Sequence, residues 1–513
     1  MAKKRNPKQR QEEAAETPAK RQWNLVDRQN LLPWVFALLA IASGVYAFDS
    51  RLSLSGDNAE FVVLGRAVAE GNGLTYVNTL DVRPATKYPF GFPLLIAIVH
   101  LIVPNSVLTL KLFVLACFVL SVPLLYRHIL EREGILLGTL TAIAVVTCHF
   151  TLGFSHQVMS EVPYLAVSVI ALLALDAARK SPSPRLIGLA VLAVMSAYYM
   201  RTIGISLIVA GAAYFLLHRQ YKEAGWFFGG SFLLALPWQI RTALVGGDSY
   251  TKTWLFRVDP YRADQGEIGW LGLIDRAFVN LEIYALRVLP QGLIPSWLNA
   301  EIAVPIGIAA SVCLVYFIIS EVARRQVAGI YLALYLGACL IWPTVWSDIR
   351  LLAPVLPLIF FGILVTLRDL LSRIPQKPIT QYGLTIVAAL IVLSNAQSVS
   401  TSAGQERRYA PEWFTYFEAA RWIRKNTASD AVIACRKAYL MSVIADRRTI
   451  SYTFSDDYDV VMTSLERADY AVVDQLAFSS TSKYLIPTIA EHPQRFAYAH
   501  HIPAPDTFIL ELE

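Results

Sequence analysis

Long apolar runs alternate with short polar segments along most of this chain. A helix that crosses a membrane needs about 20 predominantly apolar residues, which is longer than most strands and core helices of soluble proteins. Runs of roughly this length predict about eleven membrane-spanning helices. The predicted spans are residues 31–48, 106–126, 135–153, 161–178, 186–200, 202–217, 224–240, 302–320, 327–346, 351–367 and 382–397.

The positions of lysine and arginine predict how these spans are oriented. Cytoplasmic loops carry an excess of basic residues, and here the basic residues gather in alternate loops. With eleven spans, the N-terminal arm and all of these loops lie on the cytoplasmic side, and this agreement supports the span count. The basic loop residues are Arg127, Arg132, Arg179, Lys180, Arg185, Arg219, Lys222, Arg324, Arg325, Arg368, Arg373 and Lys377.

The same orientation places three large segments on the outer side. They are a first outer loop at 49–105, a second at 241–300, and the tail at 398–513, whose short strand-like runs and helical pattern predict a small extracytoplasmic α/β domain. Residues 31–397 then form a transmembrane domain, and residues 1–30 a polar, disordered cytoplasmic arm. The predicted fold class is therefore mainly α, a polytopic transmembrane helical bundle with a small C-terminal α/β domain.

The first apolar run has an alternative interpretation as a cleaved signal peptide. Val45-Tyr46-Ala47 fits a cleavage pattern, but roughly thirty polar residues precede the run, which favours a retained helix.

Composition agrees with a membrane protein and excludes several classes of function. Hydrophobic residues make up 55% of the chain and charged residues only 16%, whereas soluble domains carry about 25% charged residues. The net charge of +6 comes from short clusters between apolar runs, so we expect no nucleic-acid partner. The five cysteines form no Cys-x-x-Cys pattern that would indicate structural zinc or a redox pair.

Ionisable residues at the outer ends of the spans are the candidates for chemistry, because a charge at this depth needs a partner or a function. Asp57 and Glu60 follow the first span, where helix capping is an alternative explanation for both. Arg83 and Lys87 lie beside prolines and aromatic residues, where anionic lipid headgroups are the alternative partner. Glu161 begins the fourth span. Three roles are open for it: a helix cap, a residue that orients the acceptor, and a metal ligand.

Several short motifs follow one another along the chain. They are Gly56-Asp57-x-Ala59, Ala67-x-Ala69-Glu70-Gly71-x-Gly73-Leu74, Lys87-Tyr88-Pro89-x-Gly91-x-Pro93-Leu94, Met159-Ser160-Glu161-Val162-Pro163-Tyr164, Pro237-Trp238-Gln239-Ile240-Arg241, Asp348-Ile349-Arg350-Leu351-Leu352-Ala353-Pro354-Val355-Leu356-Pro357 and the tail segments Ala419–Ile423 and Ala468–Asp474. In this order they resemble motifs of the GT-C superfamily of membrane glycosyltransferases, most closely bacterial families akin to aminoarabinose transferases and protein O-mannosyltransferases. At Leu351 the chain departs from the Arg-Tyr-x-x-Pro pattern of that superfamily.

The resemblance implies a glycosyltransferase at the outer face of the cytoplasmic membrane, with a polyprenyl-phosphate-linked sugar as donor and a glycan, lipid or protein as acceptor. It implies catalytic roles for Asp57, as the base that deprotonates the acceptor, and for Glu161. Cations would then hold the charge that grows on the leaving phosphate. The candidate substrate-binding residues are Lys87, Arg83, Tyr88, Arg201, Arg241 and Arg350. For each arginine alone, snorkelling to the interface is the alternative role.

The sequence requires no cofactor, but a divalent metal is compatible with it. His149 and His156 lie seven residues apart, on one face if a helix continues through both. With Asp57 or Glu161 they are weak candidates for metal ligands, since histidines at the ends of spans more often serve as hydrogen-bonding residues.

Three competing functions remain at this stage. One is an oligosaccharide ligase or polymerase with a diphosphate-linked donor. Another is a lipid-sugar transporter without a bond-making step, although transporters favour internal repeats and charges at mid-span. The third is an adhesion module with a membrane anchor, which does not explain why the chain has so many spans.

Overall fold

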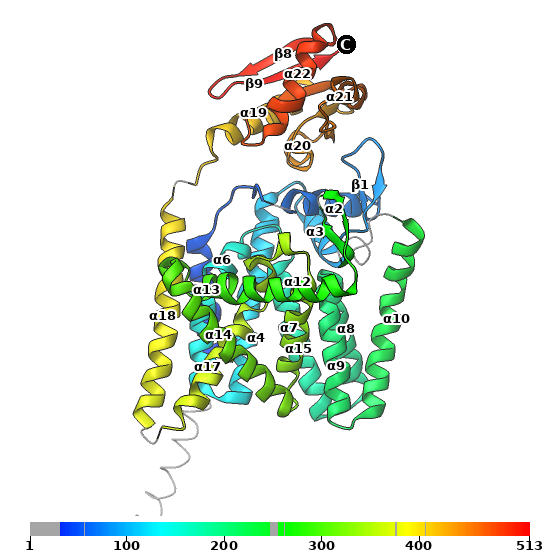
Figure 1. The fold of residues 1–513 in the computed structure, drawn as a ribbon. Helices are drawn as coiled ribbons and strands as arrows, with labels where there is room; N and C mark the ends of the chain where they lie inside the picture. Colours follow the sequence, from blue (N-terminus) through cyan, green and yellow to red (C-terminus); the bar gives the residue numbers. More distant parts are fainter. Residues whose placement is uncertain (1–30, 56, 247–254, 261, 375–376, 406) are drawn as a thin grey trace, which may run out of the picture.

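The computed structural model describes residues 31–55, 57–246, 255–260, 262–374, 377–405 and 407–513, so the predicted arm at 1–30 lies outside the described residues. The chain forms a bundle of long helices with a smaller α/β part above one end of it (Figure 1). Helix α18, Lys377–Gly404, runs the length of the bundle and leads into this C-terminal part. It therefore continues past residue 397, where the sequence predicts the end of the transmembrane domain.

Within the described residues, every predicted span coincides with helical structure. Besides α18, the helices are Leu31–Ala47, α4 Val107–Glu133, α5 Ile135–Thr147 with α6 His149–Ser155, α7 Glu161–Lys180, α8 Pro184–Met200, the short helix η1 Thr202–Gly204 with α9 Ile205–Leu217, α10 Tyr221–Val245, α14 Ala300–Ala323, α15 Val327–Ile341 and α17 Leu356–Leu371.

The bundle is that of a multi-pass membrane protein. In the described part of the chain four helices are long and apolar enough to cross a membrane, or five if the bent pair α5–α6 counts as one span. Only 22% of the most apolar window of α14 is buried, compared with 72% for α7. Helix α14 thus turns apolar side chains outward, as lipid contact requires, whereas α7 occupies the core. The count of eleven spans stays a prediction.

The predicted span 135–153 is a broken helix rather than a continuous one. Helices α5 and α6 meet at an angle of 59°, with Cys148 between them. The break frees backbone groups that must find partners in an apolar environment. The side chain of Asn395 on α18 supplies one, because its Oδ1 accepts a hydrogen bond of 2.9 Å from the His149 amide.

The first outer loop folds into helices and a small hairpin. Helix α2, Asn58–Ala69, is followed by strands β1, Thr75–Tyr76, and β2, Arg83–Pro84, and then by helix α3, Gly91–Ile102. The helical pattern after Asp57 is thus confirmed.

The second outer loop contains a helical segment that runs crosswise to the bundle helices (Figure 1). This segment consists of α12, Trp270–Ile283, the π-helical turn η2, Tyr284–Val288, and α13, Leu289–Leu293. The loop also holds strands β3, Arg257–Asp259, and β4, Arg262–Glu267. The short helices η3 Pro295–Trp297, η4 Thr344–Trp346 and α16 Ile349–Leu352 connect longer helices of the bundle.

The C-terminal part is a five-stranded sheet in the order β6-β5-β7-β9-β8. Strands β6, β5 and β7 are parallel, and β9 runs antiparallel to both β7 and β8. The strand-like runs of the tail, at 431–434, 470–473 and 507–512, appear as β5 Val432–Ala434, β7 Tyr470–Val473 and β9 Thr507–Leu512, and its helical pattern at 412–426 appears as α19 Pro411–Asn426. The helical pattern predicted between these strands appears as α20 Ala438–Ala445, α21 Tyr458–Leu465, η5 Thr481–Leu485, α22 Ile486–Glu491 and η6 Pro493–Arg495. Strands β6 Arg448–Ile450 and β8 Phe496–Ile502 were not predicted.

The C-terminal part rests on the first outer loop. Helix α20 lies above α2, and Arg66 of α2 donates a hydrogen bond of 3.3 Å to the Val443 carbonyl (Figure 1). In the loop after β1, the Asn78 carbonyl accepts a hydrogen bond of 2.7 Å from the amide of Thr449 on β6. The loop and the sheet therefore form a continuous contact above the helical bundle.

Candidate functional site

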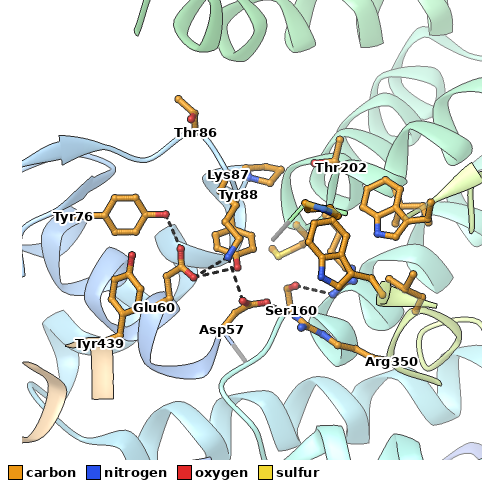
Figure 2. A pocket seen from close by; sticks show the side chains of 18 of the residues that line it. Asp57, Glu60, Tyr76, Thr86, Lys87, Tyr88, Ser160, Thr202, Arg350 and Tyr439 are labelled. Carbon is orange, nitrogen blue, oxygen red and sulfur yellow. Dashed lines mark hydrogen bonds and ion pairs between the residues drawn. The ribbon is translucent and has the colours of Figure 1, made fainter. Parts of the chain in front are cut away.

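A cavity of about 730 Å³ lies where the bundle meets the C-terminal part. Its wall comes from segments far apart in the sequence: the first outer loop, the start of α7, the turn between α8 and η1, the α16 segment and helix α20. Figure 2 shows charged and aromatic side chains that converge on this cavity. Among those lining it are Asp57, Glu60, Lys87, Arg201, Arg350 and Tyr439.

Asp57 precedes the first residue of α2, but its side chain makes no capping hydrogen bond. Its carboxylate instead meets two cations. Oδ2 lies 2.5 Å from Nη2 of Arg350, and Oδ1 lies 3.4 Å from Nζ of Lys87. Helix capping by the side chain, the alternative explanation for this residue, is therefore wrong.

Glu60 lies one turn further along α2 and belongs to the same cluster. Its Oε1 accepts a hydrogen bond of 2.6 Å from the hydroxyl of Tyr76 on β1. Its Oε2 accepts from Lys87 Nζ at 3.0 Å and from the Tyr88 hydroxyl at 3.3 Å (Figure 2). Lys87 is thus held between two carboxylates and, at 4.6 Å, against the ring of Tyr88. A capping role does not account for these contacts of Glu60.

Glu161 lies beneath the cavity rather than on its wall. Its side chain is 1% exposed, and its Oε1 lies 2.6 Å from both Arg201 Nη1 and Arg350 Nε. Arg201 also donates a hydrogen bond of 3.1 Å to the hydroxyl of Ser160. Burial of a carboxylate needs this compensation by charge and hydrogen bonds. Glu161 thereby fixes two guanidinium groups that do line the cavity.

The charges of the cluster balance, and they control the ionisation of its members. Three carboxylates, of Asp57, Glu60 and Glu161, face three cations, of Lys87, Arg201 and Arg350. Burial raises the pKa of Asp57, but the charges of Arg350 and Lys87 outweigh burial and hold this pKa well below its usual range. Burial lowers the pKa of Lys87, but Glu60 and Asp57 outweigh burial and raise it. Both groups are therefore charged at neutral pH.

Two features hold the Lys87 segment in place. A Cβ atom at Gly91 would lie 2.6 Å from the Tyr199 carbonyl oxygen, so only glycine lets the start of α3 approach the end of α8 this closely. Arg241 of α10 donates hydrogen bonds of 2.8 Å and 3.0 Å to the carbonyls of Ala85 and Leu74. Arg241 is not among the residues that line the cavity, so it supports the backbone here and does not take the position predicted for a phosphate ligand.

The structure brings together most of the predicted site. Asp57, Lys87, Tyr88, Arg83, Arg201 and Arg350 line the cavity, whereas Glu161 and Arg241 act on it from behind. Sequence reasoning weighed Glu60 only as a cap, and it missed Tyr76, Trp342, Trp346 and Tyr439, which also line the cavity. Tyr439 comes from the C-terminal part, and no motif links it to the first outer loop.

His149 and His156 do not join this site. Both line a second cavity of about 280 Å³ together with Asp49, Arg51 and Arg407. His156 follows the end of α6, so the single helical face assumed for the two histidines does not exist.

The carboxylates of the first cavity do not fit a dedicated metal site. Among the described residues no group of three or more His, Cys, Asp or Glu side chains is arranged to hold a metal ion. In the cavity, Lys87, Arg201 and Arg350 already supply the positive charge that a divalent ion would bring to these carboxylates.

Comparison with solved structures identifies proteins of the same fold. The archaeal oligosaccharyltransferase AglB from Archaeoglobus fulgidus, in complex with an inhibitory peptide and a dolichol-phosphate, is 11% identical, with a TM-score of 0.57 over 97% of this chain and 75% of that chain. ArnT from Cupriavidus metallidurans, bound to undecaprenyl phosphate, is 9% identical, with a TM-score of 0.57 over 93% of this chain and 97% of that one.

A third similar structure is the arabinofuranosyltransferase AftD from Mycobacteria. It is 13% identical, with a TM-score of 0.54 over 93% of this chain but only 40% of that chain. No protein-family model and no curated protein matches the sequence. The fold predicted from the resemblance, that of the GT-C glycosyltransferases, is therefore confirmed, and at these identities the likeness concerns the fold alone.

Proposed function

We propose that this protein is a glycosyltransferase that moves a sugar from a polyprenyl-phosphate donor to an acceptor at the outer face of the cytoplasmic membrane. One observation carries the proposal: the Asp57 carboxylate, Lys87 and Arg350 face the same cavity within contact of one another. This arrangement supports a site in which a proton acceptor and cations for a phosphate surround one reacting sugar. ArnT bound to undecaprenyl phosphate and AglB in complex with a dolichol-phosphate support a lipid phosphate as part of the donor.

The proposed reaction is a displacement at the anomeric carbon. The acceptor hydroxyl or amine forms a bond to this carbon while the carbon–oxygen bond to the phosphate breaks, and the phosphate leaves with the electron pair. Asp57 takes the proton that the acceptor loses. A carboxylate with a low pKa is a weak base, so proton transfer proceeds as the attacking group becomes acidic in the transition state.

The cations have two roles in this scheme. Lys87 and Arg350 bind the phosphate and stabilise the charge that develops as it leaves. A phosphate that draws on the same cations also weakens their hold on Asp57, which makes this carboxylate more basic when the donor is bound. Arg83 lines the cavity and forms no ion pair within the described residues, so it is a further cation for the phosphate.

The two ends of the bundle support the proposed orientation. Three ion pairs lie where α4, α14 and α17 end: Arg132 with Glu321, Arg324 with Asp369, and Arg368 with Glu133. Helix α18 begins after α17 and ends at the C-terminal part, so these basic ends lie opposite the cavity (Figure 1). An excess of basic residues is typical of the cytoplasmic side, and this supports an outer position for the cavity and the C-terminal part, residues 398–513.

Transfer by the purified chain tests the proposal. The full-length protein in lipid nanodiscs would be incubated with a panel of polyprenyl-phosphate sugars and acceptors, and release of polyprenyl phosphate followed by mass spectrometry. We expect Asp57→Asn to lower the rate by roughly 10²–10⁴-fold, the contribution of general base catalysis. The matched control is Asp81→Asn, because Asp81 is an exposed carboxylate of the same loop. Full turnover by Asp57→Asn would refute the assignment of the base.

The same assay separates the competing functions. Nanodiscs have no compartments, so activity that requires sealed vesicles would favour a transporter. Turnover only with diphosphate-linked donors would favour a ligase or polymerase. Because a further structure of the similar oligosaccharyltransferase is a complex with Zn and sulfate, parallel reactions contain EDTA or added Mg²⁺, Mn²⁺ or Zn²⁺.

A further inference from the structure

The C-terminal sheet has a switch point between two parallel strands. Strand β5 lies between β6 and β7, so the chain leaves β5 toward one side of the sheet and returns on the other. In open α/β sheets, ligands bind in the crevice outside the carboxyl ends of the strands at such a point. Here Arg436 and Lys437 come two and three residues after Ala434, the last residue of β5, and Asp474 directly follows β7.

Aromatic rings hold both cations at this edge. The Arg436 guanidinium carbon lies 4.8 Å from the ring centroids of both Phe454 and Phe478. The Lys437 Nζ lies 4.3 Å from the centroid of Phe478. Such contacts fix the direction of a cation without neutralising its charge.

Neither cation forms an ion pair with a carboxylate in the described part of the chain, and the charge of Arg436 lowers the pKa of Asp474 by less than burial raises it. The Nε atom of Arg436 is buried and makes no hydrogen bond. The nearest strand-end carboxylate, of Asp474, is used elsewhere, since it accepts hydrogen bonds from the Leu476 amide at 3.1 Å and from the Thr481 hydroxyl at 3.3 Å. The fixed guanidinium therefore presents donors with the fork geometry that matches a carboxylate or a phosphate.

An exposed aromatic surface borders the two cations. Phe454 is 49% exposed, and its ring stacks on that of Tyr484 with the centroids 5.7 Å apart. A flat apolar ring beside fixed cations suits a ligand that combines a C–H-rich face with an anionic group. The segment that carries Arg436 and Lys437 continues directly into α20, whose Tyr439 lines the first cavity.

We propose that this edge of the sheet binds the carboxylate or phosphate group of an anionic saccharide, with Arg436 and Lys437 as its ligands and Phe454 against the sugar ring. The anion site follows from the sheet itself, whereas the choice of a saccharide rests on the proposed function.

Calorimetric titration of the full-length protein tests this inference without any turnover. The protein is placed in nanodiscs of zwitterionic lipid, so that no anionic headgroup competes. The probes are glucuronate and glucose 1-phosphate, with glucose as the uncharged match and inorganic phosphate as the sugar-free match. We expect both anionic sugars to bind more tightly than glucose, and Arg436→Met to weaken them roughly ten- to a hundredfold, as for hydrogen bonds to charged groups.

Two further variants serve as a second test and as a control. Lys437→Gln keeps Arg436 and the rings, and we expect it to weaken binding by a smaller factor; it also serves if Arg436→Met does not fold. Arg424→Met removes an exposed cation of α19 and should leave binding unchanged.

Each remaining outcome decides the inference. Absence of anion binding, or unchanged affinity in folded Arg436→Met and Lys437→Gln, would overturn it. Inorganic phosphate bound as tightly as glucose 1-phosphate would overturn the saccharide assignment. A wild-type chain that binds these anions through Arg436 but transfers no sugar would refute the proposed function while supporting the anion site.

Discussion

Arg350 joins two carboxylates that the sequence separates widely. Its Nη2 lies 2.5 Å from Asp57 Oδ2, and its Nε lies 2.6 Å from Glu161 Oε1. One guanidinium thus ties the first outer loop and the start of α7 to the short helix α16. The planar, forked geometry of arginine makes this double contact available, and lysine, with a single charged nitrogen, cannot reproduce it.

Arg350→Lys should therefore separate charge from geometry. We expect at least a tenfold loss of transfer, because the ammonium keeps the charge but reaches only one carboxylate at a time. Arg350→Met should lose more, because Asp57 and Glu161 then each keep only one cation. Rates in nanodiscs and thermal unfolding of both variants provide the measurement. Equal activity of wild type and Arg350→Lys would show that the bridge is not required.

Glu161→Gln tests whether the buried carboxylate acts on stability or on substrate. Removal of one partner from a buried ion pair typically costs about 3–5 kcal/mol, because the remaining charges are uncompensated. We expect a lower unfolding temperature and a raised KM for the donor, since Arg201 and Arg350 lose their anchor. A variant of unchanged stability with a strongly reduced kcat alone would instead indicate direct participation in the chemistry.

The acid limb of the pH profile tests the environment of Asp57. The folded-state pKa of this carboxyl is depressed, so the ionised form persists as pH falls below 3.8, the ordinary value. We expect kcat/KM, which reports the free enzyme, to show no loss from Asp57 protonation between pH 5 and 8. In Lys87→Met, one of the two charges that lower the pKa of Asp57 is gone. This pKa therefore rises, and any acid limb of the profile should move to higher pH. An unchanged limb in that variant would contradict the assignment of Lys87.

Asp474 should make the C-terminal part less stable as pH rises. Burial raises the pKa of Asp474 to about 6, from an ordinary 3.8. The folded state binds this proton more tightly, so the stabilisation is complete below about pH 4 and is lost as pH rises through 6. The change amounts to about 3 kcal/mol, at 1.36 kcal/mol for each pH unit.

Hydrogen exchange of the β7 amides, corrected for the intrinsic rate, measures this dependence at pH 4.5 and 7. In Asp474→Asn the side chain is uncharged at both pH values, so this variant should lose most of the pH dependence. Wild type and variant with the same pH dependence would show that Asp474 is not the responsible group.

The apolar pattern determined where helices form. Period and run length follow from local sequence, which is why helical structure lies at every predicted span and the strands β5, β7 and β9 appear in the structure. The break between α5 and α6 escaped prediction, because its cause is a partner on a distant helix, Asn395. Strand β6 also escaped, because three residues at the edge of a sheet carry little pattern of their own.

The candidate residues Asp57, Lys87 and Arg350 could be named from motifs, but their roles relative to one another could not. Sequence cannot distinguish a capping carboxylate from an ion-paired one, since both precede a helix. Only the packed structure shows that Asp57 caps nothing, that Glu161 is buried behind the wall, and that Arg241 supports a backbone segment. The sequence by itself determined which ionisable side chains are present. The tertiary structure decided which of them are neighbours, because burial and ion pairing depend on segments that meet only in the folded chain.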